Sequence, residues 1–168
     1  MTDAVLTVLD ETGEKVVVLP HIIFRGRQAI SWDEVEKYIC RYVGSIFNIE
    51  ETNDLIYIGN DFPDEFTGST YTRKLLGGLA KAKANLVQGL PQIIEIATDK
   101  RWQMDFEDKH KKRASNGWYR YNTKFALPIM SDNGDIIRYN KYKAVLLVRY
   151  SSNGKLYLYD VQNIKKIK

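Results

Sequence analysis

The chain has 168 residues, of which 44% are hydrophobic and 27% are charged, proportions ordinary for a single globular domain. No apolar run approaches the roughly 18 residues of a membrane-spanning helix, and the N-terminus lacks the pattern of a signal peptide. We therefore expect one cytoplasmic domain over residues 1–168 that makes no membrane contact. The single cysteine, Cys40, excludes an internal disulfide, and its apolar neighbours at helical spacing favour a buried structural thiol.

The formal net charge of +4 conceals an uneven distribution of charge along the chain. Residues 1–108 contain 11 Lys and Arg against 18 Asp and Glu, which is a net charge of −7. Residues 109–168 contain 14 against 3, which is a net charge of +11. A basic half of this kind predicts a polyanionic partner, most often a nucleic acid. The alternative is that basic residues only decorate the solvent face of a sheet.

Residues 1–53 are expected to form an extension made of a hairpin and a helix. Two apolar runs flank the sequence ETGE at 11–14, which is typical of a β-hairpin. Apolar residues at helical spacing predict a helix over residues 31–47. It begins at a capping box headed by Ser31 and is weakened in its last turn by Gly44.

The core of the domain is expected over residues 54–168, and its first part is mainly helical. A short strand, DLIYIG, is followed by an acidic turn, NDFPDEF, at 60–66. Residues 69–98 then read as a long helix that Gly89 can close, with Pro91 in the first turn of a second helix.

The last part of the chain has the alternation of β-strands. Residues 117–130 form the first strand, with Tyr119, Tyr121, Thr123, Phe125 and Leu127 on one face and Trp118, Arg120, Asn122 and Lys124 on the other. A short strand IIRY and an Asn-Gly hairpin joining YKAVLLVRY to LYLYDV follow. The order predicts an α+β fold, with the N-terminal hairpin and helices packed on a C-terminal antiparallel sheet of three to four strands.

The motifs of most catalytic classes are missing from the sequence. One Cys and two His about 90 residues apart give no metal site, and neither a GxSxG elbow nor a nucleotide-binding glycine loop occurs. We therefore expect no metal and no cofactor. What remains is phosphate chemistry without a metal, in which His transfers protons, Lys and Arg stabilise phosphoryl charge, and aromatic rings stack on unpaired bases.

The segment 109–124 offers all of these residue types, and the neighbouring strands add Arg149 and Tyr159. Cations on both sides of His110 lower its pKa and favour the neutral imidazole, which suits a general base. On residue types alone, such a basic run beside a histidine is more often a contact loop for nucleic acid, or merely a solvated loop, than a catalytic centre. The residues concerned are Lys109, His110, Lys111, Lys112, Arg113, Ser115, Trp118, Tyr119, Arg120, Tyr121, Thr123 and, for binding, Lys124.

Four segments of residues 54–168 together carry a resemblance to known families: DFPDEFTGSTYTRKL, AKAKANLVQGLPQIIEIAT, KHKKRASNGWYRYNTKFALP and YNKYKAVLLVRYSSNGKLYLYDVQNIKK. This part of the chain resembles domains found in large polyvalent proteins of phages and integrative elements of Gram-positive bacteria. It is also similar to the prophage branch of the barnase/EndoU/RelE-like nuclease superfamily. It implies helices followed by a four-stranded antiparallel sheet that carries a metal-independent ribonuclease site. Lys109 and His110 would then be the catalytic pair, and Tyr121, Thr123 and Arg149 would line the sheet.

Two functions from different classes follow from these observations. The first is a metal-independent endoribonuclease of toxin or effector type that acts on RNA such as tRNA. His110 would be its general acid or base, Lys109 and Arg149 would steady the phosphate, and Trp118 would stack on a base. The second is a non-catalytic anti-defence or inhibitor module whose basic sheet binds nucleic acid or an acidic protein; a cognate inhibitor or host target is a further partner to consider. As a third alternative, acidic residues of 1–108 could cover the basic half.

Overall fold

The computed structural model describes residues 4–26, 29–103 and 116–168. In this part of the chain the strands are β1 (Leu6–Leu9), β2 (Lys15–Val18), β3 (Ile46–Asn48), β4 (Leu55–Tyr57), β5 (Thr98–Gln103), β6 (Trp118–Met130), β7 (Ile136–Tyr150) and β8 (Leu156–Ile167). The helices are α1 (Trp32–Ile39), α2 (Phe62–Gly68), α3 (Thr70–Lys74), α4 (Gly77–Leu86) and α5 (Leu90–Glu95), with 3₁₀ turns at Cys40–Tyr42 and Val87–Gly89.

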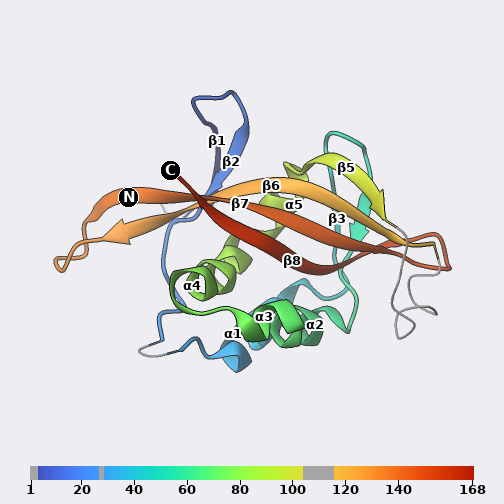
Figure 1. Ribbon diagram of the computed structural model, residues 1–168, viewed down its shortest axis with the longest axis horizontal. Coiled ribbons are helices and arrows are strands. Elements are labelled where there is room, and N and C mark those ends of the chain that lie inside the picture. Colours follow the sequence, from blue (N-terminus) through green and yellow to red (C-terminus); the bar gives the residue numbers. More distant parts are fainter. Residues whose placement is uncertain (1–3, 27–28, 104–115) are drawn as a thin grey trace.

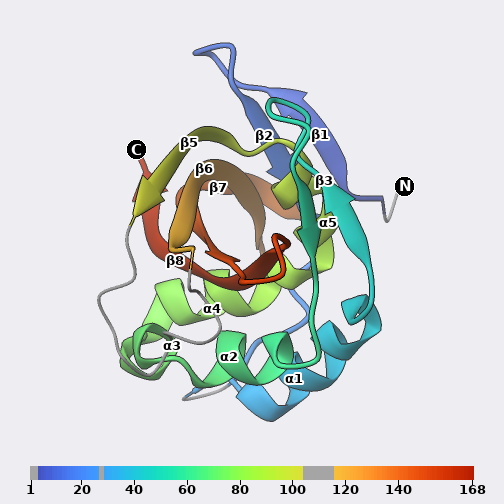
Figure 2. The same ribbon diagram turned by 90° about the vertical axis from the view of Figure 1, so that its right-hand side faces the viewer.

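The strands form one mixed sheet that curls into a half-barrel, with the helices gathered on one side of it (Figures 1 and 2). The order of strands is β1-β2-β6-β7-β8-β4-β3, and β5 pairs with the same edge of β6 that β2 uses further along. The long strands β6, β7 and β8 form an antiparallel meander at its centre.

The predicted fold class is wrong in the size and type of the sheet. The antiparallel meander was expected, but the sheet does not stop at three or four strands. β2 joins β6 in parallel, with Val17 opposite Phe125, and β4 joins β8 in parallel, with Ile56 opposite Leu156. These pairings link segments about 100 residues apart in the sequence, so neither a turn signal nor local alternation predicts them.

The helical segments are shorter than the sequence predicts. The helix expected over 31–47 ends at Ile39, and after a 3₁₀ turn the chain reverses at Gly44, whose φ of +88° suits glycine. The Ser31 side chain makes no capping hydrogen bond, and Cys40 is exposed, so both predictions were wrong. In the segment 69–98 the break at Gly89 and the second helix with Pro91 in its first turn are confirmed, since α5 begins at Leu90. The part before Gly89 is not one helix but α3 and α4, and the expected acidic turn overlaps the helix α2.

The core lies between the helices and the inner face of β6–β8. The alternation predicted for β6 is confirmed, because Tyr121 and Phe125 are buried among helix side chains while Asn122 is exposed on the other side. Leu86, Leu90 and Ile94 pack against this inner face, as do many other apolar residues of the chain. The outer face of β6–β8 is therefore the one left to make contacts with a ligand.

Candidate functional site

Two of the predicted site residues lie inside the protein. Tyr121 is fully buried, and its hydroxyl donates a hydrogen bond to Asp54 Oδ2 at 2.7 Å. Thr123 is 4% exposed, and its hydroxyl donates to the carbonyl oxygen of Ile93 at 2.8 Å. Burial and the neighbouring carboxylate raise the pKa of Tyr121, because both favour the neutral phenol. Both hydroxyls are engaged within the core, so we do not include them in the candidate site.

Arg149 and Trp118 lie on the opposite, outer face, directly across from one another on β7 and β6. Arg149 is 8% exposed and its Nη1 lies 3.1 Å from Glu65 Oε2. Its guanidinium carbon lies 5.4 Å from the centre of the Tyr157 ring, and its Nε has no hydrogen-bond partner among the described residues. The indole of Trp118 packs edge-on against Tyr159, with ring centres 5.1 Å apart.

The structure therefore divides the predicted constellation between two faces of the sheet. Tyr121 and Thr123 point into the core that the helices cover. Arg149 lies on the other face of the meander, where it pairs with Glu65 of α2. The other predicted residues of the basic run, Lys109, His110, Lys111, Lys112 and Arg113, lie outside the described residues. Their roles stay predictions from the sequence.

Three lysines form a row across the outer face of the meander. The register places Lys124 of β6 directly opposite Lys143 of β7, and Lys143 directly opposite Lys165 of β8. Like charges at directly opposed positions destabilise a sheet. Such a row is stable only where anionic groups, from the protein itself or from a ligand, lie close to the lysines.

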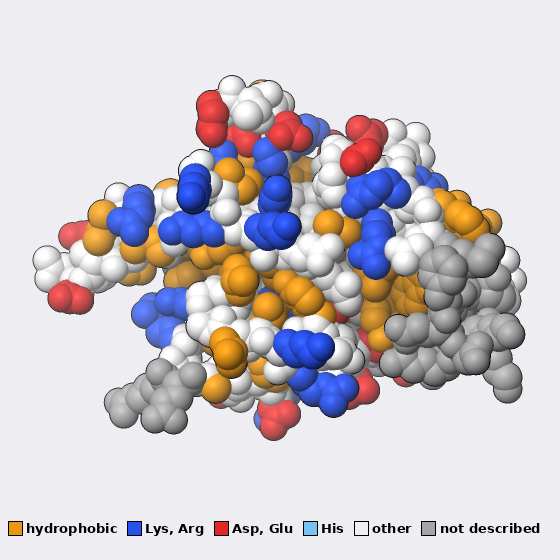
Figure 3. Space-filling model, in the orientation of Figure 1, with side chains coloured by type: hydrophobic (Ala, Val, Ile, Leu, Met, Phe, Trp, Pro, Cys, Tyr) orange, Lys and Arg blue, Asp and Glu red, His pale blue; other side chains and the backbone are white. Residues whose placement is uncertain are grey.

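More cations surround this row on the same face. We call the set the basic face; it consists of Arg101, Arg120, Lys124, Lys141, Lys143 and Lys165. Asp160, the one acidic residue in β6–β8, is buried against α3 and α4 instead. Lys and Arg side chains follow the long strands in Figure 3, and acidic side chains of the β1–β2 hairpin stand above them.

Arg120 is fixed within the basic face by a neighbour on β5. Its Nε donates a hydrogen bond of 2.7 Å to Gln103 Oε1, and Arg101 lies directly opposite it in the register. Burial and the adjacent Arg101 lower the pKa of Arg120 from its ordinary value. Arg101 in turn pairs with Asp99 Oδ2 at 3.0 Å, so a carboxylate of the protein itself lies beside these two opposed cations.

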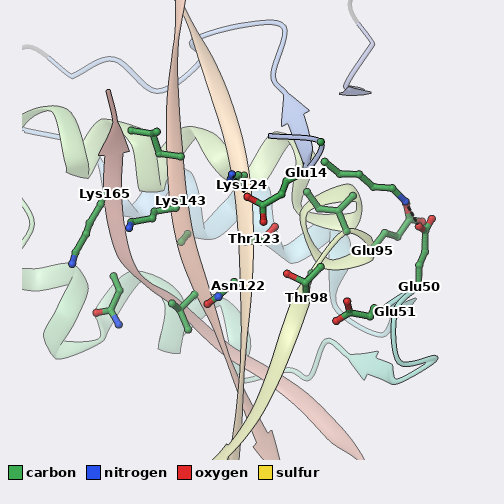
Figure 4. A pocket seen from close by; sticks show the side chains of 18 residues that line it. Glu14, Glu50, Glu51, Glu95, Thr98, Asn122, Thr123, Lys124, Lys143 and Lys165 are labelled. Carbon is green, nitrogen blue, oxygen red and sulfur yellow. Dashed lines mark hydrogen bonds and ion pairs between the residues drawn. The ribbon is translucent and has the colours of Figure 1, made fainter. Parts of the chain in front are cut away.

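A groove of about 940 Å³ runs along the lysine row (Figure 4). Lys124, Lys143 and Lys165 line it on the side of the long strands, together with the exposed side chain of Asn122 on β6. Carboxylates line its other side, where Glu50 pairs with Lys15 at 2.7 Å. The remaining acidic lining residues are Glu14, Glu51 and Glu95.

The turn of the β1–β2 hairpin brings acidic side chains onto two of the lysines. Lys124 Nζ lies 3.0 Å from Asp10 Oδ2 and 2.6 Å from Glu14 Oε1. Lys141 Nζ lies 3.4 Å from Asp10 Oδ2 and 3.0 Å from Glu11 Oε1. For these residues, the arrangement fits the alternative that acidic side chains of the first 108 residues cover part of the basic half.

Lys143 and Lys165 make no ion pair within the described part of the chain. Neither lysine was among the site residues predicted from the sequence, and neither was Lys141. Their signal was present as the alternation in KYK at 141–143 and as the adjacent lysines of IKKI at 164–167. This pattern alone does not show that the lysines lie in one row with Lys124, because that depends on the register between the strands.

Within the described ranges, no group of three or more His, Cys, Asp or Glu side chains could hold a metal ion. No helix in those ranges is both long and apolar enough to cross a membrane. Comparisons of the chain with family models, with curated proteins and with solved structures found no match. The likeness to a nuclease superfamily therefore stays a prediction, and the function has to be argued from the outer face itself.

Proposed function

We propose that the protein binds a nucleic acid strand along the basic face, with the row Lys124–Lys143–Lys165 contacting the phosphates. The observation that carries this proposal is the direct opposition of three lysines across three adjacent strands. Without an anion the row is unfavourable, since each lysine is held beside a like charge. A strand of phosphates placed over the row removes that repulsion.

The geometry of the row suits a polymer of regularly spaced charges. Neighbouring strands lie about 4.8 Å apart, so the Cα atoms of Lys124 and Lys165 are separated by about 10 Å. Flexible lysine side chains on this spacing can reach successive phosphates without requiring a particular base sequence. Binding would release the counterions condensed on the phosphates, and its affinity would fall steeply as salt is added.

The test is a titration of a fluorescent single-stranded RNA of mixed sequence with the full chain at several salt concentrations. The double variant Lys143→Gln with Lys165→Gln should bind at least tenfold more weakly. Its slope of log affinity against log salt should be smaller by about 1.4, because two phosphate contacts are lost at about 0.7 each. Lys143 and Lys165 are exposed, so the variant should fold normally.

The matched control is Lys37→Gln with Lys74→Gln, which removes the same charge from the exposed sides of α1 and α3. The control should keep nearly the wild-type affinity. Absence of salt-dependent binding by the wild type, or an equal loss in the control, would overturn the proposal. Binding of polyglutamate as tightly as RNA would instead assign the face to an acidic protein.

The endoribonuclease stays a prediction from the sequence. His21 is the only histidine among the described residues; it follows β2 in the chain, and its carbonyl oxygen accepts a hydrogen bond from Gln88. Since His110 lies outside those residues, the structure supports binding by the basic face and adds no support for cleavage.

A further inference from the structure

The tip of the β1–β2 hairpin is built to hold carboxylates over the basic face. Asp10 accepts hydrogen bonds from the backbone N–H and hydroxyl of Thr12, at 2.9 and 2.6 Å, and from the N–H of Glu14 at 3.1 Å. These bonds close the turn and leave the second carboxylate oxygen of Asp10 to Lys124 and Lys141. Glu11 and Glu14 flank Asp10 and contact the same two lysines.

Three carboxylates of the hairpin tip therefore pair with two lysines of the basic face, Lys124 and Lys141. The pKa of Lys141 is raised by its hydrogen bond to Glu11, and the pKa of Glu14 is lowered by its hydrogen bond to Lys124, as each contact favours the charged forms. Oxygen atoms with negative charge at 2.6–3.4 Å from a lysine are what a phosphate group would also supply.

We propose that the hairpin tip, residues 10–14, is a built-in competitor of the nucleic acid. A bound strand would displace Glu11 and Glu14 from Lys141 and Lys124 and place phosphates there, extending the track beyond Lys143 and Lys165. This inference rests on the proposed function of the basic face. It adds that the protein's own acidic side chains lower the affinity of that face.

The contacts of Glu11 and Glu14 can be exchanged because these two side chains are exposed, whereas Asp10 is buried and keeps its place. The side chains of Glu11 and Glu14 are 77% and 59% exposed, so water and salt screen their ion pairs. The base of the hairpin is held separately, since Val17 is fully buried and pairs with Phe125 of β6. The tip can lose its two outer contacts while the base of the hairpin stays in the sheet.

The experiment compares RNA affinity of the wild type with Glu11→Gln, Glu14→Gln and the double variant. Asp10 is left intact because it organises the turn. The double variant should bind at least about fivefold more tightly than the wild type. The control Asp33→Asn with Glu34→Gln removes two negative charges from exposed positions on α1 and reports the effect of net charge alone. It should change the affinity less than twofold.

A coupling measurement distinguishes competition from a general charge effect. In a Lys124→Gln background, Glu14→Gln should no longer improve binding, since its partner lysine has been removed. The proposal that the tip competes with RNA would be wrong if Glu14→Gln raised the RNA affinity equally with Lys124 present and with Lys124→Gln. It would also be wrong if the gain in affinity were no larger than that of the α1 control. If neither the wild type nor the double variant binds RNA, the proposed function fails and the competitor fails with it. If the wild type and the double variant bind RNA with the same affinity, the proposed function stands and only the proposal of a competing hairpin tip fails.

Discussion

Tyr121 Oη lies 2.7 Å from Asp54 Oδ2 and donates a hydrogen bond that ties β6 to the turn between β3 and β4. Asp54 also accepts from Thr52 Oγ1 at 2.7 Å and pairs with Lys100 at 3.0 Å. The hydroxyl that the sequence predicted for phosphate chemistry is thus part of a polar network that joins β5 and β6 to the turn between β3 and β4. Hydrogen-bonding capacity near a basic segment does not reveal which face of the strand a side chain occupies.

Removal of this hydroxyl should weaken the fold and leave ligand binding intact. Tyr121→Phe deletes one hydrogen bond to a carboxylate, and such bonds contribute about 1.5–3 kcal/mol to the free energy of unfolding. Urea denaturation should show a loss in this range or somewhat below it, since Asp54 keeps two partners. The control Tyr139→Phe, at an exposed position on β7, should cost little. A loss of RNA affinity without a loss of stability would return Tyr121 to the site.

The stability contributed by this network should depend on pH. Burial acts to raise the pKa of Asp54, but hydrogen bonds from Tyr121 and Thr52 and the charge of Lys100 outweigh it and lower that pKa. A carboxyl group with a lowered pKa in the folded state stabilises the fold above its unfolded pKa, near 3.9, and loses that contribution as the pH falls further. The difference in unfolding free energy between wild type and Tyr121→Phe should therefore be constant from pH 7 to about pH 5 and shrink below about pH 4. A difference that grows in acid would contradict this assignment.

A second polar network is sealed inside the core. Lys83 of α4 and Asp160 of β8 are both fully buried, with 2.5 Å between Nζ and Oδ1. Lys83 also lies 2.6 Å from Thr72 Oγ1, and Ser69 donates a hydrogen bond to Asp160 Oδ2 at 2.8 Å. Burial lowers the pKa of Lys83 to about 8, and Asp160 opposes that shift. The pair orients α3 and α4 against β8.

Loss of one member of this pair should destabilise the protein strongly, because the other charge is left buried without its partner. Asp160→Asn and Lys83→Met should each lower the free energy of unfolding by about 3–5 kcal/mol. The double variant Lys83→Met with Asp160→Leu should lose less than the sum of the two single variants, since no charge then remains in the core. Urea denaturation of the four proteins measures this coupling. Additive losses would show that the two charges do not depend on one another.

Local patterns in the sequence predicted the elements that depend on nearby residues. The period of two divided the side chains of β6 correctly between two faces, although it did not show which face is buried, and the Asn-Gly turn between β7 and β8 was placed correctly. The lysine row depends on more, because β8 carries an irregularity around Asn163, whose φ is +53°. This extra residue sets which side chain of β8 lies opposite Lys143. No pattern in the sequence shows where a strand takes up an extra residue, so the row could not be predicted.

The ribonuclease prediction can be separated from nucleic acid binding by experiment. The wild type, His110→Ala and the double variant Lys143→Gln with Lys165→Gln are incubated with total RNA in EDTA, and the products are run on a denaturing gel. If His110 transfers a proton during cleavage, its alanine variant should bind RNA like the wild type and lose cleavage by a factor of about 10²–10⁴. The lysine variant should cleave less only because it binds less, so saturating protein should restore its rate. Equal cleavage by wild type and His110→Ala would remove His110 from the mechanism. RNA that stays intact in every lane, together with a salt-sensitive complex on a native gel, would leave binding as the function of the basic face.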